Sequence, residues 1–226
     1  MARDFDGIDD AIDYGSDASI DDFSQITIAA WFVTDNAALS YAIFRKDGAA
    51  FKLLRISLAD NDVLELSHGF SVTRGDWFGS NGANTAGQRY HGVYTYDNTS
   101  VLNNGQAYLD GATDTMTEDS TPVGTATLDA ARNASSGDDF FMDGRLQTLC
   151  YDNTIWDAAS RNRHRWWGVA PGGPSTVKMW HPFYTSDLNN KGTATANGTA
   201  SGTLMASFAT PTVRPGTAMM GMGVGW

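Results

Sequence analysis

Residues 89–111, RYHGVYTYDNTSVLNNGQAYLDG, predict two β-strands in immediate succession and limit the possible folds strongly. From position 90 to 96, tyrosines alternate with other residues, which is the period-two pattern of a half-buried strand rich in aromatic and β-branched side chains. Turn-forming Asn and Gly residues then lead to a second short strand at 106–109, which ends at Asp110-Gly111. Because Asn, Asp and Gly tolerate the left-handed backbone of tight turns, the segment predicts an antiparallel hairpin.

The composition also favours a β-protein rich in turns. Only two of the 26 acidic residues are glutamates, Glu65 and Glu118, in a chain of 226 residues. Asp favours turns and caps, whereas Glu favours helices, so this bias disfavours a helical protein. The net charge of −11 argues against nucleic-acid binding, which needs a basic surface. The single Cys150 excludes an internal disulfide framework and is expected in a buried strand.

Three further segments predict strands. Residues 5–15 alternate in character and close at Gly15, which predicts a first strand with turns. Residues 26–33 are apolar on both faces, as expected of a central strand in a sandwich. Residues 142–151 alternate again and predict a late strand.

One helix and one long loop are predicted between the strands. The segment 157–167 has Asp157 as a candidate N-cap and Gly168 as a stop signal, so it predicts a short helix. The Gly- and Asn-rich segment 74–88 predicts a loop that exposes its aromatic residues. Together with the strands, these segments predict an all-β fold with one short helix.

Several of these segments resemble laminin-G-like domains of the concanavalin A-like lectin/glucanase superfamily. FDGIDD is similar to the family's F-D-G-x-x-D opening, and ITIAAW is similar to its F-T-I-x-A-W core strand. YHGVYTYD and YLDG are similar to W-H-x-x-x-T-Y-D and Y-x-D-G, with Tyr90 in place of Trp, and FMDGRLQTLCYDN is similar to F-x-G-x-I-D-E-V-R-I-Y-N. The resemblance implies an antiparallel two-sheet jelly-roll sandwich at residues 1–210, followed by a C-terminal tail or arm at 211–226.

The chain lacks the motifs of the enzymes in that superfamily. A glucanase of this kind needs Glu-x-Asp-x-x-Glu on one strand, so that two carboxylates flank the glycosidic bond. Glu65 and Glu118 lie far apart in the sequence and outside that motif. The motifs Gly-x-Ser-x-Gly, HExxH, CxxC and a phosphate loop are also absent from the sequence. We therefore expect a protein that is not an enzyme.

Exposed aromatic residues and amides are the expected apparatus for binding a glycan, because rings stack on sugar faces and amides bind hydroxyls. The predicted loop offers Trp77, Phe78, Asn81 and Asn84 as candidates. The alternative for Trp77, that it closes one end of the sandwich, is equally open. Trp166 and Trp167 in the predicted helix are also candidates, although closing the sandwich is the favoured interpretation for this pair.

Calcium is the candidate cofactor, because carboxylate, amide and carbonyl oxygens suit this hard cation. The candidate ligands are Asp9 and Asp10 in the opening segment and Asp138 and Asp139 in a later loop. The resemblance supports the same cation, since several laminin-G-like domains bind Ca²⁺ near strand-edge loops. The favoured alternative is that these carboxylates are solvated loop acids.

Two segments are candidates for binding a protein partner. Arg161, Arg163 and Arg165 concentrate positive charge in an acidic chain and could contact an acidic protein surface. The favoured alternative is a solvated helix face on which arginine stems cover apolar surface. In the tail, Met219, Met220 and Trp226 would anchor the chain to a partner or to further copies of itself.

The leading functional hypothesis is a non-catalytic protein of a virion surface. The N-terminal residues lack the apolar core of a signal peptide, and no run approaches the ~18 apolar residues of a membrane span, so we expect synthesis in the cytoplasm without membrane insertion. A chain with this layout resembles stand-alone laminin-G-like proteins encoded among tailed-phage structural genes, which implies capsid or tail decoration. The partners would be virion proteins or copies of the chain, with some glycan binding. The alternative is a carbohydrate-binding lectin module that uses calcium.

Overall fold

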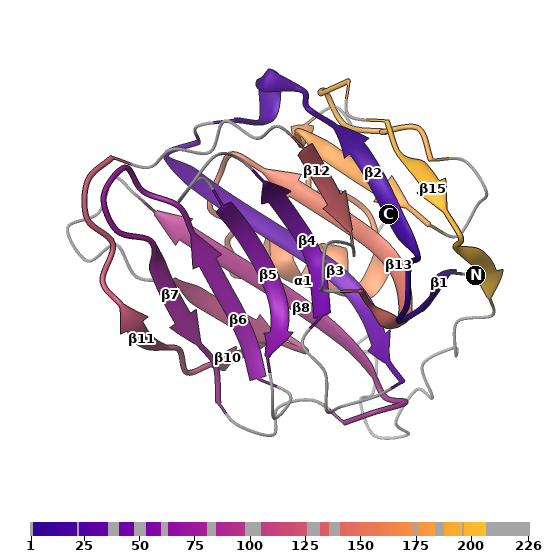
Figure 1. The fold of residues 1–226 in the computed structure, drawn as a ribbon, viewed down its shortest axis with the longest axis horizontal. Coiled ribbons are helices and arrows are strands. Elements are labelled where there is room, and N and C mark those ends of the chain that lie inside the picture. The colour runs from indigo at the N-terminus through magenta and orange to yellow at the C-terminus, as the bar shows by residue number, and fades with distance from the viewer. Residues whose placement is uncertain are drawn as a thin grey trace, which may run out of the picture.

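The computed structural model describes residues 2–21, 23–35, 41–47, 53–59, 63–80, 85–97, 105–125, 132–135, 141–173, 176–183, 188–195 and 197–206. These residues form two eight-stranded β-sheets, stacked one behind the other in Figure 1. Neighbouring strands are antiparallel in every pairing. The predicted all-β, antiparallel two-sheet sandwich is therefore confirmed. The proposed tail at 211–226 lies outside the described residues, so the division at residue 210 stays a prediction.

The two sheets interleave strands that are distant in sequence. The first sheet has the order β10 (Ala112–Asp114), β9 (Gln106–Leu109), β8 (Arg89–Asp97), β3 (Gln25–Thr34), β13 (Asp143–Asp152), β1 (Ala2–Asp6) and β16 (Leu204–Ala206), and β14 (Met179–Pro182) also pairs with β13. The second sheet has the order β11 (Thr117–Ser120), β7 (Gly75–Phe78), β6 (Val63–His68), β5 (Leu53–Ala59), β4 (Tyr41–Asp47), β12 (Arg132–Ser135), β2 (Ala11–Gly15) and β15 (Thr199–Ser201). One short 3-10 helix, η1 (Ala18–Ile20), follows β2.

The predicted hairpin at 89–111 is confirmed in the first sheet. Strand β8 pairs with β9 in a register that places Gly92 opposite Leu109 and Thr95 opposite Gln106. The backbone of Asp110 and Gly111 is left-handed, with φ of 50° and 85°, and reverses the chain into β10. Turn residues of this type were expected there because their backbone tolerates positive φ.

The opening segment differs from the prediction of a single strand with turns. It forms two strands in different sheets, because Gly7 has a φ of 75° and ends β1 before the chain crosses to β2. The turn at residues 7–10 thus joins the two layers of the sandwich.

The predicted loop at 74–88 is also partly wrong. Residues Gly75–Phe78 form β7, which lies between β6 and β11 in the second sheet. A strand of four residues is too short to show a period-two pattern in the sequence. Because successive side chains of a strand point to opposite faces of the sheet, Trp77 and Phe78 of β7 point to opposite sides.

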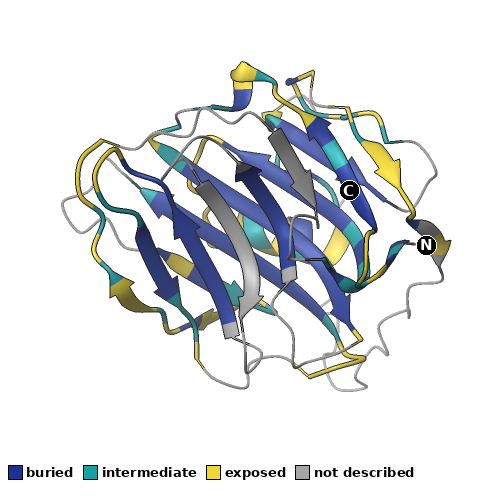
Figure 2. Ribbon diagram, in the orientation of Figure 1, coloured by how far each residue is buried: buried dark blue, intermediate teal, exposed yellow. Residues whose placement is uncertain are grey.

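Strands β3 and β8 of the first sheet are dark blue along most of their length in Figure 2, so successive residues, which point to opposite faces, are both buried. On β3, Ile26, Ile28 and Phe32 belong to the core between the sheets. The alternating residues face outward, where Ala29 joins a second apolar cluster with Val93, Cys150, Trp156, Ala170, Val177 and Trp180. The expectation that residues 26–33 form a central strand is confirmed, because β3 lies between β8 and β13, and Cys150 is buried as expected.

The predicted helix is α1 (Ala158–Trp167), which lies on the outer face of the first sheet. The side chain of Asp157 accepts a hydrogen bond from the Ser160 amide at 2.7 Å, which makes it the N-cap. Gly168 has a φ of 62° and its amide donates to the carbonyl of His164 at 2.8 Å, which ends the helix. Both predicted ends of the helix are confirmed.

Replacement of Gly144 by Ala should test how closely β13 and β3 are packed. Gly144 has a φ of 146°, and an added Cβ would overlap the carbonyl oxygen of Val33 on the neighbouring strand. We expect Gly144→Ala to lower the free energy of unfolding by about 2–4 kcal/mol. The β13–β3 hydrogen-bond ladder must shift to make room for the Cβ, and the backbone strain at this φ adds to that cost. Urea denaturation measures this change.

Gly87→Ala is the matched control, since Gly87 has a φ of 76° but nothing within 4 Å of an added Cβ. It should cost only the conformational strain of about 1–2 kcal/mol. Equal losses in the two variants would contradict a packing role for Gly144.

Candidate functional site

The loop expected to bind a glycan does not present its Trp to solvent. Trp77 is only 1% exposed and packs against Tyr96 in the core, with ring centroids 5.3 Å apart. Because β7 is a strand, Trp77 points between the sheets and Phe78 points the other way, where it is half-buried. The prediction that Trp77 contacts a glycan is therefore wrong. Asn81 and Asn84 lie outside the described residues.

The exposed aromatic surface is instead on α1. Trp166 is 68% exposed and Trp167 is 76% exposed, whereas the other exposed large apolar side chains of the described residues are aliphatic. The expectation that these two residues close the sandwich is wrong. Two adjacent exposed indoles on a regular helix are unusual, because burying an indole ring lowers the free energy of the folded protein.

A buried histidine explains why α1 turns this face outward. His164 has no exposed surface, and its Nδ1 lies 2.8 Å from Nε2 of His91 on β8, so one nitrogen donates to the other. Its Nε2 lies 3.3 Å from the hydroxyl of Thr148 on β13. This polar contact fixes the rotation of the helix, and a pair separated by 73 residues leaves no signal in the sequence.

Burial also determines the charge state of the histidine pair. It lowers the pKa of His164 from its ordinary value of 6.5 to about 3. Burial, and then the proximity of His164, lowers the pKa of His91 well below its ordinary value. The pair is therefore uncharged at neutral pH, and in each neutral ring one nitrogen can donate while the other accepts.

The three arginines of α1 have different environments. The guanidinium of Arg161 lies 3.7 Å from the centre of the Tyr108 ring and donates to the carbonyl of Trp156 at 2.6 Å, so it fastens the helix to the first sheet. Arg165 lies 4.9 Å from the centre of the Trp166 ring. Arg163 is exposed and lies three and four residues before the two indoles, on the same side of the helix.

The three arginines predicted to bind a partner fall into two groups, one packed on the sheet and the other beside the exposed indoles. Arg161 behaves as the favoured alternative proposed, because its side chain covers an apolar ring. Arg163 and Arg165 stand beside the exposed indoles. Met219, Met220 and Trp226 lie outside the described residues, so partner binding by the tail stays a prediction.

A pocket of about 290 Å³ lies at the opposite end of α1, and its lining includes Asp152, Thr154, Trp156 and Asp157. Its acidic groups already have partners. The carboxylate of Asp152 accepts from Nε1 of Trp156 at 2.8 Å and from the hydroxyl of Thr154 at 2.7 Å. Asp157 caps the helix. Because these carboxylates stabilise the turn before α1, the exposed face of the helix is the stronger candidate site.

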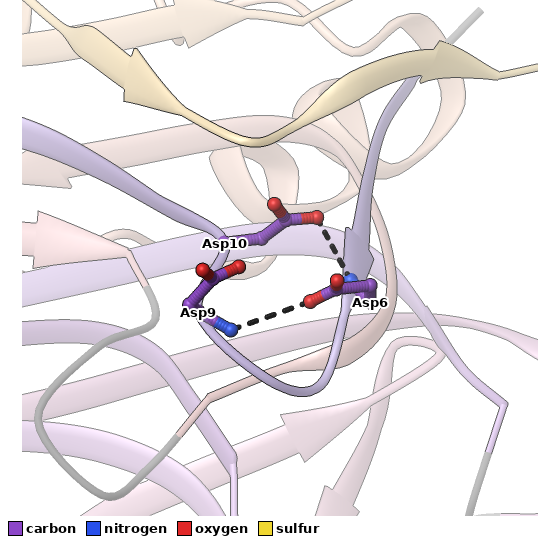
Figure 3. A group of neighbouring side chains, drawn as sticks. All are labelled: Asp6, Asp9 and Asp10. Carbon is purple, nitrogen blue, oxygen red and sulfur yellow. Dashed lines mark hydrogen bonds between the residues drawn. The ribbon is translucent and has the colours of Figure 1, made fainter.

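The predicted metal ligands Asp9 and Asp10 lie in the turn between β1 and β2, where Asp6 joins them (Figure 3). Their ligand oxygens lie within 4.8 Å of one another. A carboxylate oxygen of Asp6 accepts from the Asp9 amide at 3.4 Å, and one of Asp10 accepts from the Asp6 amide at 2.9 Å. Burial raises the pKa of Asp10, and the charges of Asp6 and Asp9 add to this. Asp138 and Asp139 lie outside the described residues.

Carboxylate oxygens so grouped suit a hard cation such as Ca²⁺. The hydrogen bonds within the turn hold the same arrangement in the absence of a cation, so calcium binding stays a prediction.

Solved structures share this architecture at low sequence identity. A candidate carbohydrate-binding protein from Bacteroides ovatus aligns over 90% of this chain with a TM-score of 0.62 and 15% identity, and the chain spans 58% of that structure. Domains LG4-5 of the mouse laminin α1 chain align over 70% of this chain and 43% of theirs, with a TM-score of 0.53 and 10% identity. The CBM40 domain of the Ruminococcus gnavus IT-sialidase, bound to α2,3-sialyllactose, aligns over 70% of this chain and 95% of its own, with a TM-score of 0.50 and 9% identity.

These similarities show the fold. The chain has the concanavalin A-like jelly roll that laminin G domains also have, as its sequence motifs indicated. No protein-family model matches the sequence. No curated protein matches it either.

The histidine pair should make the protein sensitive to mild acid. The folded state keeps His164 uncharged, with a pKa of about 3 against an ordinary value of 6.5. It therefore binds fewer protons than the unfolded state below pH 6.5, so stability is full above that pH and falls as the pH decreases toward 3. Between pH 7.5 and 5, His164 alone should cost about 2 kcal/mol.

Urea denaturation at these two pH values measures the loss. His164→Gln cannot take up the proton, so its stability should decrease by about 2 kcal/mol less over the same interval. An unchanged pH dependence in this variant would assign the effect to another group, such as the buried His68, whose pKa burial also lowers to about 3.

Calcium at the turn of Asp6, Asp9 and Asp10 should raise the thermal stability of the protein. A cation present at about 100 times its Kd stabilises the folded state by about 3 kcal/mol. We expect the melting temperature to fall on addition of EDTA, and Asp9→Asn to remove the difference between calcium and EDTA. Asp119→Asn, an exposed acid on β11, is the matched control. Identical melting curves with calcium and with EDTA would contradict a calcium site.

Proposed function

We propose that this protein is a non-catalytic carbohydrate-binding domain and that Trp166 and Trp167 form its sugar-contacting surface. The observation that carries the proposal is the exposure of these neighbouring indoles, 68% and 76%, on a helix that is fastened to the sheet. The fastening groups are His164, which contacts His91 on β8, and Arg161, which lies against the Tyr108 ring on β9, so this face of the helix has a fixed orientation relative to the sheet.

The chemistry of the indole suits a sugar ligand. One face of a pyranose ring carries C–H groups that pack on an aromatic face, while the indole N–H donates to a hydroxyl. A rigid aromatic residue also loses little conformational entropy on binding. Asn162, which is exposed between Arg161 and Arg163, adds an amide that can bind hydroxyls.

The comparisons support the same class of ligand. The Bacteroides protein is described as a candidate carbohydrate-binding protein, and the CBM40 domain is bound to a sialylated sugar. Because the chain spans 58% of the Bacteroides structure, only the binding function of the shared fold is proposed here.

The positions of the two glutamates support binding without catalysis. Glu65 is buried on β6, where the hydroxyl of Ser67 donates to it at 3.1 Å. Glu118 is exposed on β11 and accepts from the hydroxyl of Thr121. These contacts are structural, and a glycosidase pair requires two carboxylates that flank one bond.

The expected role on a virion surface stays a prediction. It depends on partner binding by residues 211–226, which lie outside the described residues, and the solved structures named above bear on sugar binding instead.

No helix among the described residues is long and apolar enough to cross a membrane.

Replacement of both indoles should abolish glycan binding while the fold survives. Trp166→Ala and Trp167→Ala remove stacking surface, so each should weaken binding by about tenfold on a glycan array. The free energy of unfolding should change by less than about 0.5 kcal/mol, because both side chains are exposed. The conservative variants Trp166→Phe and Trp167→Phe should retain most of the binding.

A binding signal that survives the double Ala variant would contradict this site. Release of reducing sugar from a bound glycan would contradict the non-catalytic assignment.

A further inference from the structure

We propose that Arg163 makes the indole surface of α1 selective for carboxylated sugars, meaning pyranose rings that carry a carboxylate, as in uronic and sialic acids. This inference rests on the proposed function, since it names the class of glycan that the same surface binds. It assigns to Arg163 the role of a specificity determinant.

The side chain of Arg163 is available to a ligand. Arg161 is committed to the Trp156 carbonyl and the Tyr108 ring, and Arg165 lies beside Trp166. Arg163 is exposed, and its side chain makes no hydrogen bond with any other described residue. The acid that interacts with it electrostatically is the N-cap Asp157, whose pKa is held below its usual value by Ser160 and further by Arg161 and Arg163.

Arg163 is also placed beside the indoles on the helix. Arg163 precedes Trp166 and Trp167 by three and four residues, so its guanidinium emerges from the same side of α1 as the indoles. A sugar ring that packs on an indole would therefore hold a ring substituent near the guanidinium. A carboxylate matches this group because its two oxygens accept two parallel N–H bonds, which a hydroxyl cannot do.

The charge on α1 is complementary to that of an acidic sugar. The protein carries a net charge of −11, which disfavours the approach of an anionic ligand to most of its surface. On α1 the local balance is different, because three arginines occupy positions 161, 163 and 165 and the N-cap is the acid Asp157. Charges beyond about 8 Å are screened at physiological ionic strength, so the local balance decides whether an acidic sugar binds.

The test measures the binding of two matched pairs of probes to the full chain by isothermal titration calorimetry. One pair is trigalacturonic acid and its methyl ester, and the other is 3′-sialyllactose and lactose. We expect at least one acid to bind about tenfold more tightly than its neutral counterpart, with an affinity that falls as salt is added. The pair that shows this preference identifies the source of the carboxylate.

Arg163→Gln should reduce the affinity for the acidic probe by about fivefold to tenfold and leave the affinity for the neutral probe unchanged. Arg74→Gln is the matched control, because it removes one positive charge beside β7 in the opposite sheet, where Arg74 pairs with Asp76. It should leave the preference intact. Circular dichroism spectra of both variants should match that of the parent protein.

The outcomes separate this inference from the proposed function. Equal, tryptophan-dependent binding of acidic and neutral sugars, unaffected by Arg163→Gln, would overturn the selectivity and leave sugar binding in place. Failure of every carboxylated and neutral glycan to bind would overturn both. Tryptophan-dependent self-association in sedimentation, or binding only to vesicles of anionic phospholipid, would replace the sugar by a second copy or a membrane surface and overturn both.

Discussion

The burial of β3 on both of its faces is the constraint on which the rest of the structure depends. Its inward residues pack against the second sheet, and its outward residues Ala29, Trp31 and Val33 are buried as well. A sandwich of two sheets covers only one face of each, so the outer face of the first sheet needs a further layer. Helix α1 and the segments beside it supply that layer. Trp156 and Val177 join the apolar cluster of the outer face, and His164 of α1 contacts His91 and Thr148 on the sheet.

The way in which α1 is attached to this layer determines what the helix presents to solvent. A purely apolar contact would leave its rotation weakly specified, whereas the hydrogen bond between His91 and His164 requires one orientation. Arg161 adds a second contact with the sheet, because its guanidinium lies 3.7 Å from the centre of the Tyr108 ring on β9. With these two groups turned toward the sheet, helical geometry places Arg163, Trp166 and Trp167 away from it.

The sequence predicts the scaffold well because its signals are local. The hairpin of β8 and β9, the two-faced strand β3 and both caps of α1 follow from period, turn residues and capping chemistry. The position of Trp77 could not be predicted, since β7 is too short to show a period and is defined by pairing with β6 and β11. The candidate site could be predicted only as a set of residue types. Which side of α1 faces the sheet depends on a contact between residues 73 positions apart.

The resulting arrangement inverts the usual preference of side chains for the interior. A histidine, which loses hydration on burial, occupies the inner position on α1, while two tryptophans, which would gain from burial, remain in water. The turn before the helix shows that the fold can bury an indole nearby. Trp156 is 3% exposed there, and its Nε1 donates a hydrogen bond to the Asp152 carboxylate. Stability alone therefore does not account for the exposure of Trp166 and Trp167. A ligand that covers the two rings would remove their apolar surface from water, and this burial would stabilise the complex. For this reason the exposed face of α1, and not the pocket beside Asp152, is the stronger candidate for the functional site.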